Sequence, residues 1–143
     1  MKVRDIMSQP AIHINPGESV EVAARTLTHY NIGFLPVCSG GQLRGVVTDR
    51  DMVIRCVASG RKPSETMVRD VMTGKVEQVQ PDMEASVAAH LMGRKRVRRL
   101  PVVEHGRVKG ILSLDDLAAN EQNAYDAADA LGEICAYFLQ NKC

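Results

Sequence analysis

The sequence predicts an α/β (α+β) fold of two tandem β-α-β-β-α repeats packed sheet to sheet, followed by a C-terminal amphipathic helix. Three observations predict it: a set of motifs that returns at a fixed offset, a hydrophobic period that changes in the same order in both copies, and a helical apolar stripe at the end of the chain. We expect the first repeat with its linker at 1–67, the second repeat at 68–120 and the helix at 121–143.

The internal repeat has an offset of 65 residues. VRDIM at 3–7 returns as VRDVM at 68–72, and Leu35-Pro36-Val37 returns as Leu100-Pro101-Val102, with no gap between them. Self-similarity at a fixed period marks a repeated structural unit. Because each copy alone has few apolar faces, we expect the two sheets to pack against each other as one body.

The hydrophobic period predicts the elements of each copy. In the first copy, alternation at 11–14 indicates a strand, helical spacing from Val20 indicates a helix of about a dozen residues, and the apolar runs on either side of Gly40-Gly41 indicate a hairpin. Helical character returns at 49–58 and ends at Gly60. The second copy repeats this order over 76–119.

The tail predicts a helix with one apolar stripe. The stripe advances in steps of four and three residues through Ala124, Ala128, Leu131, Cys135 and Phe138. One basic and four acidic residues give the tail a net charge of −3, whereas each repeat carries +2. The helix therefore suits a basic surface on its own repeats or on a second subunit, and we slightly favour the second subunit.

Composition predicts an ordinary globular protein of the cytoplasm. The chain is 45% hydrophobic and 24% charged, no apolar run reaches the roughly 18 residues of a membrane helix, and the polar Lys2-Val3-Arg4-Asp5 after Met1 is unlike a signal peptide. A net charge of +1 argues against attraction of the whole surface to nucleic acid or anionic lipid. The four cysteines form no C-x-x-C pair, so we expect reduced thiols, with Cys38 and Cys56 in the core.

A hydroxyl and a carboxylate stand three residues apart at the start of the last helix of each repeat. They are Thr48 with Asp51 and Ser113 with Asp116. A helix N-terminus and a hydroxyl can hold a phosphate, and the carboxylate can accept hydrogen bonds from a ribose cis-diol. The same spacing is also a capping pattern that stabilises the helix start and binds nothing. Spacing alone leaves both interpretations open.

Two tandem units that open with V-R-D-h-M and close with L-P-V…G…G-h-h-[ST]-x-x-D closely resemble a pair of CBS (cystathionine-β-synthase-type) domains, a stand-alone Bateman module. The resemblance covers about 3–120. It implies a regulatory ligand containing adenosine, such as AMP, ADP, ATP or NAD, with the hydroxyls and acids above lining clefts and the acids on the ribose. It also implies a homodimer shaped as a flat disc.

The run from Arg94 to Arg99 is the dense positive patch of the sequence. Planar guanidinium groups suit phosphate, and the resemblance implies this role for Arg98 and Arg99, because a basic pair precedes the matching strand in the family's energy-sensing kinase subunits. The first copy has Gly33-Phe34 there. We therefore expect asymmetric sites, the second being better for a charged phosphate tail. A solvated basic face is the alternative, above all for 94–96.

The remaining site residues are apolar. The resemblance implies an adenine slot at the first strand of each copy, formed by Ile12, Ile14, Val76 and Val79, although β-branched strand residues are typical of any core. The four histidines lack catalytic or metal-site spacing. Asp49, Asp115 and Asp116 suggest magnesium, but hard-cation sites usually add more oxygen ligands. We expect no enzyme activity, no catalytic cofactor and no metal site of the protein itself, and we expect any metal to lie on nucleotide phosphates.

The sequence favours a nucleotide-sensing module without a membrane partner. Ligand binding would change the angle between the repeats and the hold on an unidentified protein target. The alternative is a ligand-free structural dimer or scaffold in which Thr48 and Ser113 only cap helices. An RNA-binding module that uses Arg94–Arg99 is disfavoured, because no aromatic residues interleave with the arginines.

Overall fold

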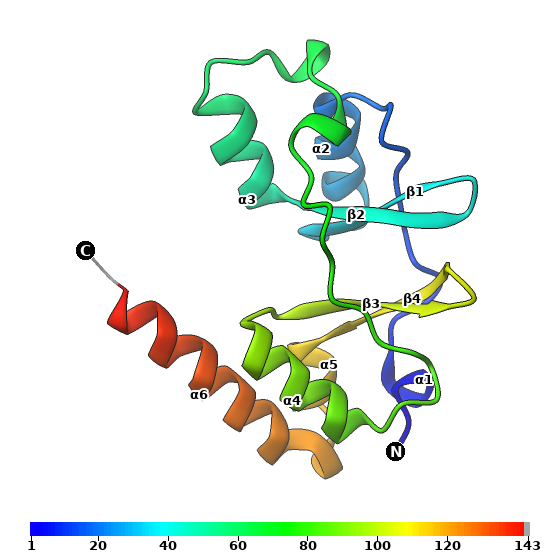
Figure 1. Cartoon of the computed structure of the whole chain (residues 1–143), viewed down its shortest axis with the longest axis vertical. Helices are drawn as coiled ribbons and strands as arrows, with labels where there is room; N and C mark the ends of the chain where they lie inside the picture. Colours follow the sequence, from blue (N-terminus) through cyan, green and yellow to red (C-terminus); the bar gives the residue numbers. More distant parts are fainter. Residues whose placement is uncertain (142–143) are drawn as a thin grey trace. The chain divides into compact units, whose positions relative to one another are not determined.

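The computed structural model describes residues 1–141, which form two compact units (Figure 1). The first-repeat unit comprises 12–76 and 106–108, and the second-repeat unit comprises 1–11, 77–105 and the chain from Lys109 onward. Each unit contains helices and a two-stranded sheet, so the mixed α/β class with a C-terminal helix is confirmed.

The first-repeat unit is a hairpin with helices. Its elements are α2 (Val20–Tyr30), β1 (Phe34–Ser39), β2 (Gln42–Thr48), α3 (Asp49–Met52), the π-helical turn η1 (Val53–Val57), and the 3-10 helices η2 (Pro63–Glu65) and η3 (Val68–Asp70). The strands are antiparallel, with Leu35 opposite Val47. Gly40 and Gly41 both have positive φ, which a tight hairpin turn requires and glycine adopts without a steric cost. The predicted hairpin is therefore confirmed.

The predicted first strand of each copy is much shorter than expected. Only Ile14 pairs with Val37, and Val79 with Val102, each as a single parallel bridge. Pro16 and Pro81 follow two residues later. Because proline has no N–H to donate, the ladder cannot extend past these positions. The alternation of apolar residues correctly indicated an extended segment but not a full strand.

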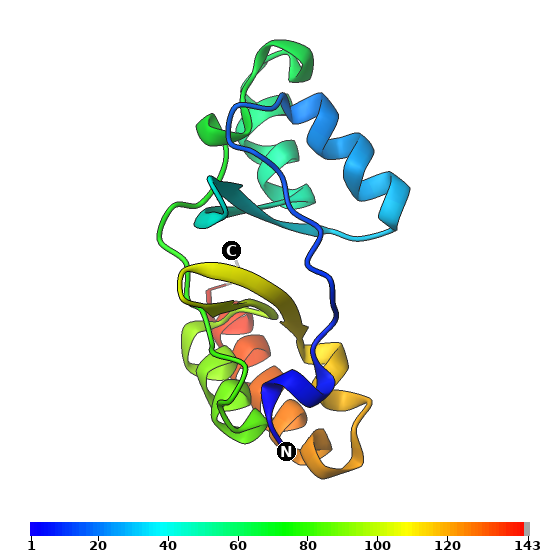
Figure 2. The same ribbon diagram turned by 90° about the vertical axis from the view of Figure 1, so that its right-hand side faces the viewer.

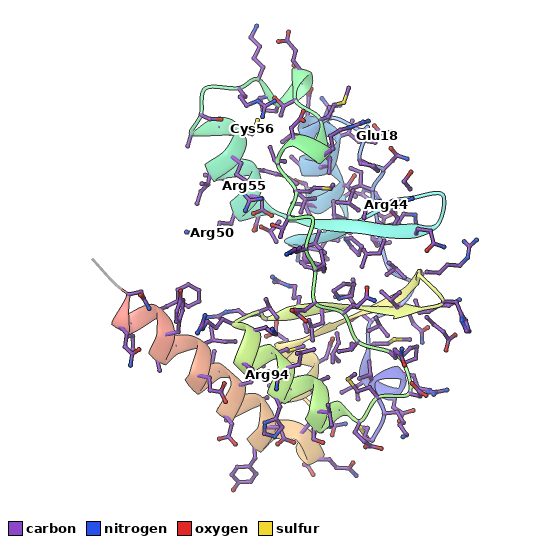
Figure 3. All side chains as sticks on the ribbon, viewed as in Figure 1. Glu18, Arg44, Arg50, Arg55, Cys56 and Arg94 are labelled. Atoms are coloured by element: carbon purple, nitrogen blue, oxygen red, sulfur yellow. The ribbon has the colours of Figure 1, made fainter. Side chains whose placement is uncertain are left out.

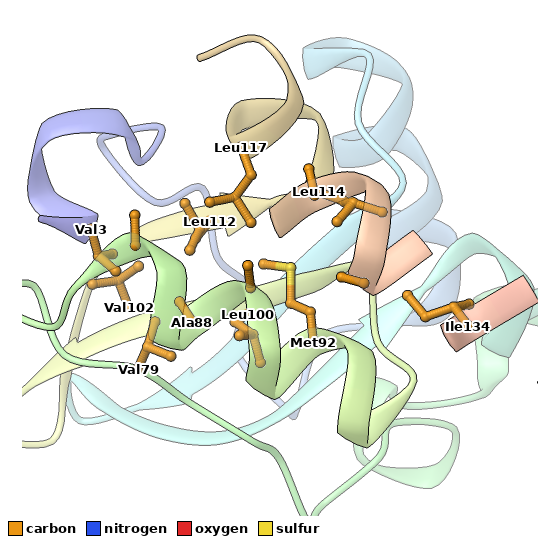
Figure 4. Packing of buried hydrophobic residues seen from close by; sticks show 14 residues of the cluster. Val3, Val79, Ala88, Met92, Leu100, Val102, Leu112, Leu114, Leu117 and Ile134 are labelled. Atoms are coloured by element: carbon orange, nitrogen blue, oxygen red, sulfur yellow. The ribbon is translucent and has the colours of Figure 1, made fainter. Parts of the chain in front are cut away.

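The second-repeat unit is built around a similar hairpin. Its elements are α1 (Val3–Ile6), α4 (Ala85–Lys95), β3 (Arg99–Glu104), β4 (Arg107–Ser113), α5 (Leu114–Ala118), the 3-10 helix η4 (Glu121–Asn123) and α6 (Ala124–Gln140). Figure 4 shows its core, in which Met92 of α4, Leu100 of β3 and Leu117 of α5 pack together. Burial of these side chains from water is the main source of its stability.

The opening motif of each sequence repeat packs in the unit of the other repeat. Val3 belongs to the core of the second-repeat unit, and its N–H donates to the carbonyl of Met83 at 2.9 Å. Val68 belongs to the core of the first-repeat unit, and its N–H donates to the carbonyl of Glu18 at 2.9 Å. The packing units therefore exchange the V-R-D-h-M segments of the two sequence repeats.

Helix α6 docks on α4 and α5 of its own chain, and Figure 2 shows it beside α4. Its buried face consists of Ala127, Ala130 and Ile134, and the guanidinium of Arg96 lies 3.8 Å from the centre of the Tyr137 ring. The expected preference for a second subunit is thus wrong for this face. Most of the predicted stripe lies on another face, where Leu131 and Phe138 are exposed.

Within residues 1–141, no helix combines the length and the apolar character needed to cross a membrane.

Candidate ligand sites at two helix starts

The first candidate site lies where β2 passes into α3. The hydroxyl oxygen of Thr48 accepts a hydrogen bond from the N–H of Asp51 at 3.1 Å, and the carboxylate of Asp51 accepts one from the N–H of Thr48 at 3.0 Å. This reciprocal arrangement is a capping box, which satisfies two backbone donors at the helix start.

The second candidate site repeats this geometry where β4 passes into α5. The Ser113 hydroxyl accepts from the N–H of Asp116 at 3.1 Å, and the Asp116 carboxylate accepts from the N–H of Ser113 at 2.9 Å. All four side chains are half-buried. Capping uses one oxygen of each acid. The second oxygen of Asp116 is able to accept from a ligand, whereas Oδ1 of Asp51 lies 3.8 Å from the Arg55 guanidinium, and both hydroxyl hydrogens are able to donate to a ligand.

The segment that leads into the first hairpin strand lies beside the helix start in each unit. The N–H of Asp49 donates to the carbonyl of Gly33 at 3.2 Å, and the N–H of Leu114 donates to the carbonyl of Arg98 at 2.8 Å. The backbone of Arg98 is therefore hydrogen-bonded to the residue that follows Ser113. In the first-repeat unit a Cβ on Gly33 would lie 3.0 Å from the Asp49 carboxylate, so this position has little room for a side chain.

The basic run divides into paired and unpaired side chains. Lys95 forms an ion pair with Glu77 at 3.6 Å, and Arg96 stacks on Tyr137. The exposed side chains of Arg94, Arg98 and Arg99 make no hydrogen bond or ion pair among residues 1–141. Two guanidinium groups therefore stand free at the strand start of the second-repeat unit, where the first-repeat unit has none.

The four apolar candidates do not behave alike. Ile14 and Val79 are buried and form the single bridges described above, so both are core residues. Ile12 and Val76 are half-buried. Val76 lies in the first-repeat unit and Val79 in the second-repeat unit, so the structure does not bring this pair into one unit.

Arg55 is a site residue that the sequence reasoning missed. Its Nη2 lies 3.8 Å from Asp51 Oδ1, and its Nη1 donates to the carbonyls of Val71 at 2.9 Å and Met72 at 3.2 Å (Figure 3). Asn120 occupies the equivalent position of the second repeat. The i,i+4 spacing of Asp51 and Arg55 on a predicted helix was the available signal.

Three of the cysteines lie within the described residues. Cys38 and Cys56 are buried and free, as predicted, and burial raises the pKa of the Cys38 thiol. Cys135 is free and exposed on α6, and Cys143 lies outside the described residues. Across residues 1–141, no three His, Cys, Asp or Glu side chains gather as ligands for a metal ion.

Comparisons with known proteins agree with the repeat. The family model described as CBS domain matches residues 3–57 and 68–122. The CBS domain-containing protein YhcV of Bacillus subtilis (strain 168) is 35% identical over 132 residues, which cover 92% of this chain and 94% of that protein. Hypoxic response protein 1 of Mycobacterium tuberculosis (strain ATCC 25618 / H37Rv) is 30% identical over 116 residues, 80% of this chain and 81% of that protein.

One of the similar solved structures is a complex with two adenosine compounds. The CBS domain pair of protein MJ0100, in complex with 5-methylthioadenosine and S-adenosyl-L-methionine, is similar with a TM-score of 0.76 and 29% sequence identity. The match covers 83% of this chain and 94% of that one.

Proposed function

Because the chain belongs to the CBS domain family, we propose that it is a regulatory module that binds an adenosine-containing ligand such as AMP, ADP, ATP or NAD. The observation that carries the proposal is the paired geometry of the two helix starts, each with a half-buried hydroxyl and a half-buried acid three residues later. The adenosine ligands of the similar MJ0100 pair support the ligand class.

In this proposal each side chain has a distinct role. The carboxylates of Asp51 and Asp116 accept hydrogen bonds from ribose hydroxyls, Asp51 while it also lies near Arg55, and the hydroxyls of Thr48 and Ser113 donate to phosphate. Arg98 and Arg99 bind the phosphate in the second repeat. In the first repeat the adenine lies against the half-buried Ile12, beside the core residue Ile14. We assign no adenine contact to Val76 and Val79, because they lie in different units.

Regulation follows if the ligand prefers one arrangement of the repeats. The protein acts as a cytoplasmic homodimer, and ligand binding changes the arrangement of the repeats and the hold on a protein target. Such a shift requires different affinities for the two arrangements. We assign no reaction to the module.

Calorimetry across adenosine, AMP, ATP, NAD and S-adenosylmethionine tests the proposal. We expect saturable heat for at least one of them and a rise of the melting midpoint with its concentration, because a ligand that binds only the folded state stabilises it. Flat titrations and unchanged midpoints across the whole series contradict ligand binding. They would favour the ligand-free scaffold, for which the two capping boxes are the supporting observation.

Two substitutions of one acid separate capping from binding. Asp116→Asn keeps an oxygen that can accept from the Ser113 N–H but loses the charge, whereas Asp116→Ala loses both. We expect the asparagine variant to melt near the wild-type midpoint and to bind the ligand about 10-fold to 100-fold more weakly, as the loss of a charge-assisted hydrogen bond implies. If both variants bind the ligand with unchanged affinity, Asp116 does not contact the ligand.

The two arginines are tested by comparing ligands with and without phosphate. The double substitution Arg98→Ala, Arg99→Ala should weaken AMP about 10-fold or more while leaving adenosine unchanged, because only AMP carries the phosphate. Arg94→Ala is the matched control, since Arg94 is an exposed and unpaired arginine of the same run but lies on α4 (Figure 3). Equal losses in the double variant and the control would indicate only a general effect of charge.

A further inference from the structure

An apolar groove lies between α2 and the α3–η1 segment of the first-repeat unit, where the helices pack side by side. It has a volume of about 520 Å³. Its lining includes Ala24, Leu27 and Thr28 of α2 and Met52, Val53 and Val57 of the second segment. Val53 and Val57 remain 57% and 61% exposed, which is unusual for neighbouring valines on one short segment.

The equivalent surface of the second repeat indicates which kind of element can cover this groove. At the offset of 65 residues, Ala24, Leu27, Thr28 and Met52 correspond to Ala89, Met92, Gly93 and Leu117. The second set is fully buried under α6, whose Ala130 Cα would lie 3.1 Å from a Cβ on Gly93. In the first-repeat unit Ala24 and Thr28 are exposed. In the second-repeat unit this surface is covered by an α-helix with an apolar face. The equivalent groove of the first-repeat unit therefore also suits an apolar helix.

Helix α6 has a second apolar face. Leu131, Cys135, Phe138 and Leu139 recur at helical spacing beside the buried face, and all four are exposed. Phe138 is 56% exposed and Leu139 is 69% exposed. Each chain therefore carries a groove shaped for a helix and a helix with an uncovered apolar stripe.

The charges of the two surfaces are complementary. Helix α6 contains Asp126, Asp129 and Glu133 and no basic residue, and these acids form no ion pair within residues 1–141. Beside the groove, Arg50 follows the lining residue Asp49 and Lys62 precedes the lining residue Pro63. These two basic side chains also have no ion-pair partner in the described chain. The charged lining residue Asp49 is acidic, but the opposite charges of α6 and of Arg50 and Lys62 next to the lining favour this pairing over contact of two like surfaces.

We infer that the exposed stripe of α6, defined by Leu131, Cys135, Phe138 and Leu139, docks in the α2/α3 groove of a second copy of this chain. In a two-fold dimer the contact occurs twice, because each copy supplies one helix and one groove. The inference rests on the homodimer of the proposed function and specifies its surface.

Sedimentation velocity of single variants tests the contact. Val57→Asp places a charge in the groove and Phe138→Asp places one on the stripe, and each should raise the dimer dissociation constant by more than about 30-fold, as loss of a central apolar contact does. Val87→Asp is the control, because Val87 is 53% exposed on α4 and belongs to neither surface. A mixture of the two variants should regain part of the dimer, since one intact helix–groove pair remains. Dimers unaffected by either variant overturn the inference.

Cross-linking locates the contact. We would combine Val53→Cys with Cys143→Ser, treat the protein with a short bismaleimide and digest it. Using a mixture of ¹⁴N-labelled and ¹⁵N-labelled chains, we expect a cross-link from Cys135 to position 53 that joins light and heavy peptides. A wild-type protein that stays monomeric, or cross-links only within one chain, overturns the inference.

The two proposals can fail separately. AMP calorimetry of Val57→Asp measures ligand binding in a variant whose helix starts are intact. If the wild type dimerises through the groove and binds no adenosine compound, the sensor function fails and the docking surface remains. If ligands bind and the dimer is insensitive to both variants, the docking surface fails and the sensor function remains.

Discussion

Charge at the residue scale distinguishes the two helix starts. In the first repeat the Asp51 carboxylate lies near the Arg55 guanidinium, which also binds the carbonyls of Val71 and Met72. In the second repeat Asn120 replaces that arginine, and the nearby basic residues are Arg98 and Arg99 at the start of β3. The two helix starts therefore differ in the basic residues of their surroundings, which favours different ligands or different poses.

Glu84 provides a test that depends on pH. Hydrogen bonds from Lys2 and the N-terminal amine, together with their positive charges, lower the pKa of its carboxyl. A lowered pKa means that the contact stabilises the fold above the ordinary pKa of glutamate and is lost as pH falls through the folded-state value. We expect the ¹³C-detected titration of Glu84 to lie below the ordinary value of a glutamate and to move upward in Lys2→Met. A titration of Glu84 that does not move in Lys2→Met would contradict this pairing.

The site could be predicted from sequence as far as local spacing determines it. Hydroxyl and acid three residues apart predicted the helix starts at Thr48 and Ser113, and the structure places both there as capping boxes. Spacing could not show that Arg96 packs on Tyr137 or that Lys95 pairs with Glu77, because these partners come from distant segments. The resemblance to the family had singled out Arg98 and Arg99, but the partners of Lys95 and Arg96 became identifiable only in the fold.

At the element scale, Gly45 allows β2 to approach the segment after η3. The N–H of Val46 donates to the Thr73 carbonyl at 3.0 Å, and a Cβ on Gly45 would lie 2.5 Å from that oxygen. We expect Gly45→Ala to lower the free energy of unfolding by about 1–3 kcal/mol in urea titrations, because neither backbone can move without breaking the bridge.

Two further variants provide a counterpart and a control for Gly45→Ala. Gly110→Ala is its counterpart in the second repeat, where a Cβ would lie 2.7 Å from the Ser8 carbonyl, so a similar loss is expected. Gly74→Ala is the control, because no atom lies within 4 Å of its added Cβ, and we expect it to be neutral or to stabilise by up to about 1 kcal/mol. A loss in Gly74→Ala equal to that in Gly45→Ala would mean that chain flexibility, and not close approach, decides the effect.

Element prediction succeeded where one apolar face decides the structure. The hairpin of Phe34–Ser39 and Gln42–Thr48 and the helix Val20–Tyr30 follow the predicted periods closely. The strand predicted at 11–14 is only a single bridge at Ile14 in the structure, because Pro16 ends the hydrogen-bond ladder. In α6 both Ile134 and Leu131 belong to apolar stripes, and the period alone cannot say which one packs on α4.

At the scale of the whole molecule, the exchanged motifs connect the two packing units. The segments at 3–7 and 68–72 are nearly the same sequence, VRDIM and VRDVM, so neither carries local information about which core it joins. The surrounding chain decides instead: Val3 bonds to Met83 and Val68 bonds to Glu18. This explains why the sequence indicated a repeat but not the exchange.

The exchange of the V-R-D-h-M segments predicts which amides exchange hydrogen faster when a core leucine of either unit is replaced. Leu35 and Leu100 are equivalent leucines, 0% and 1% exposed, in the cores of the first-repeat and second-repeat units respectively. Replacing either by alanine should cost about 2–5 kcal/mol of unfolding free energy through lost burial and a cavity. In native-state hydrogen exchange we expect Leu100→Ala to speed exchange at the Val3 and Met7 amides far more than at Val68 and Met72. Leu35→Ala should do the reverse, because each motif opens with the core that holds it. If each variant instead speeds exchange in the motif of its own sequence repeat, the exchanged packing is refuted.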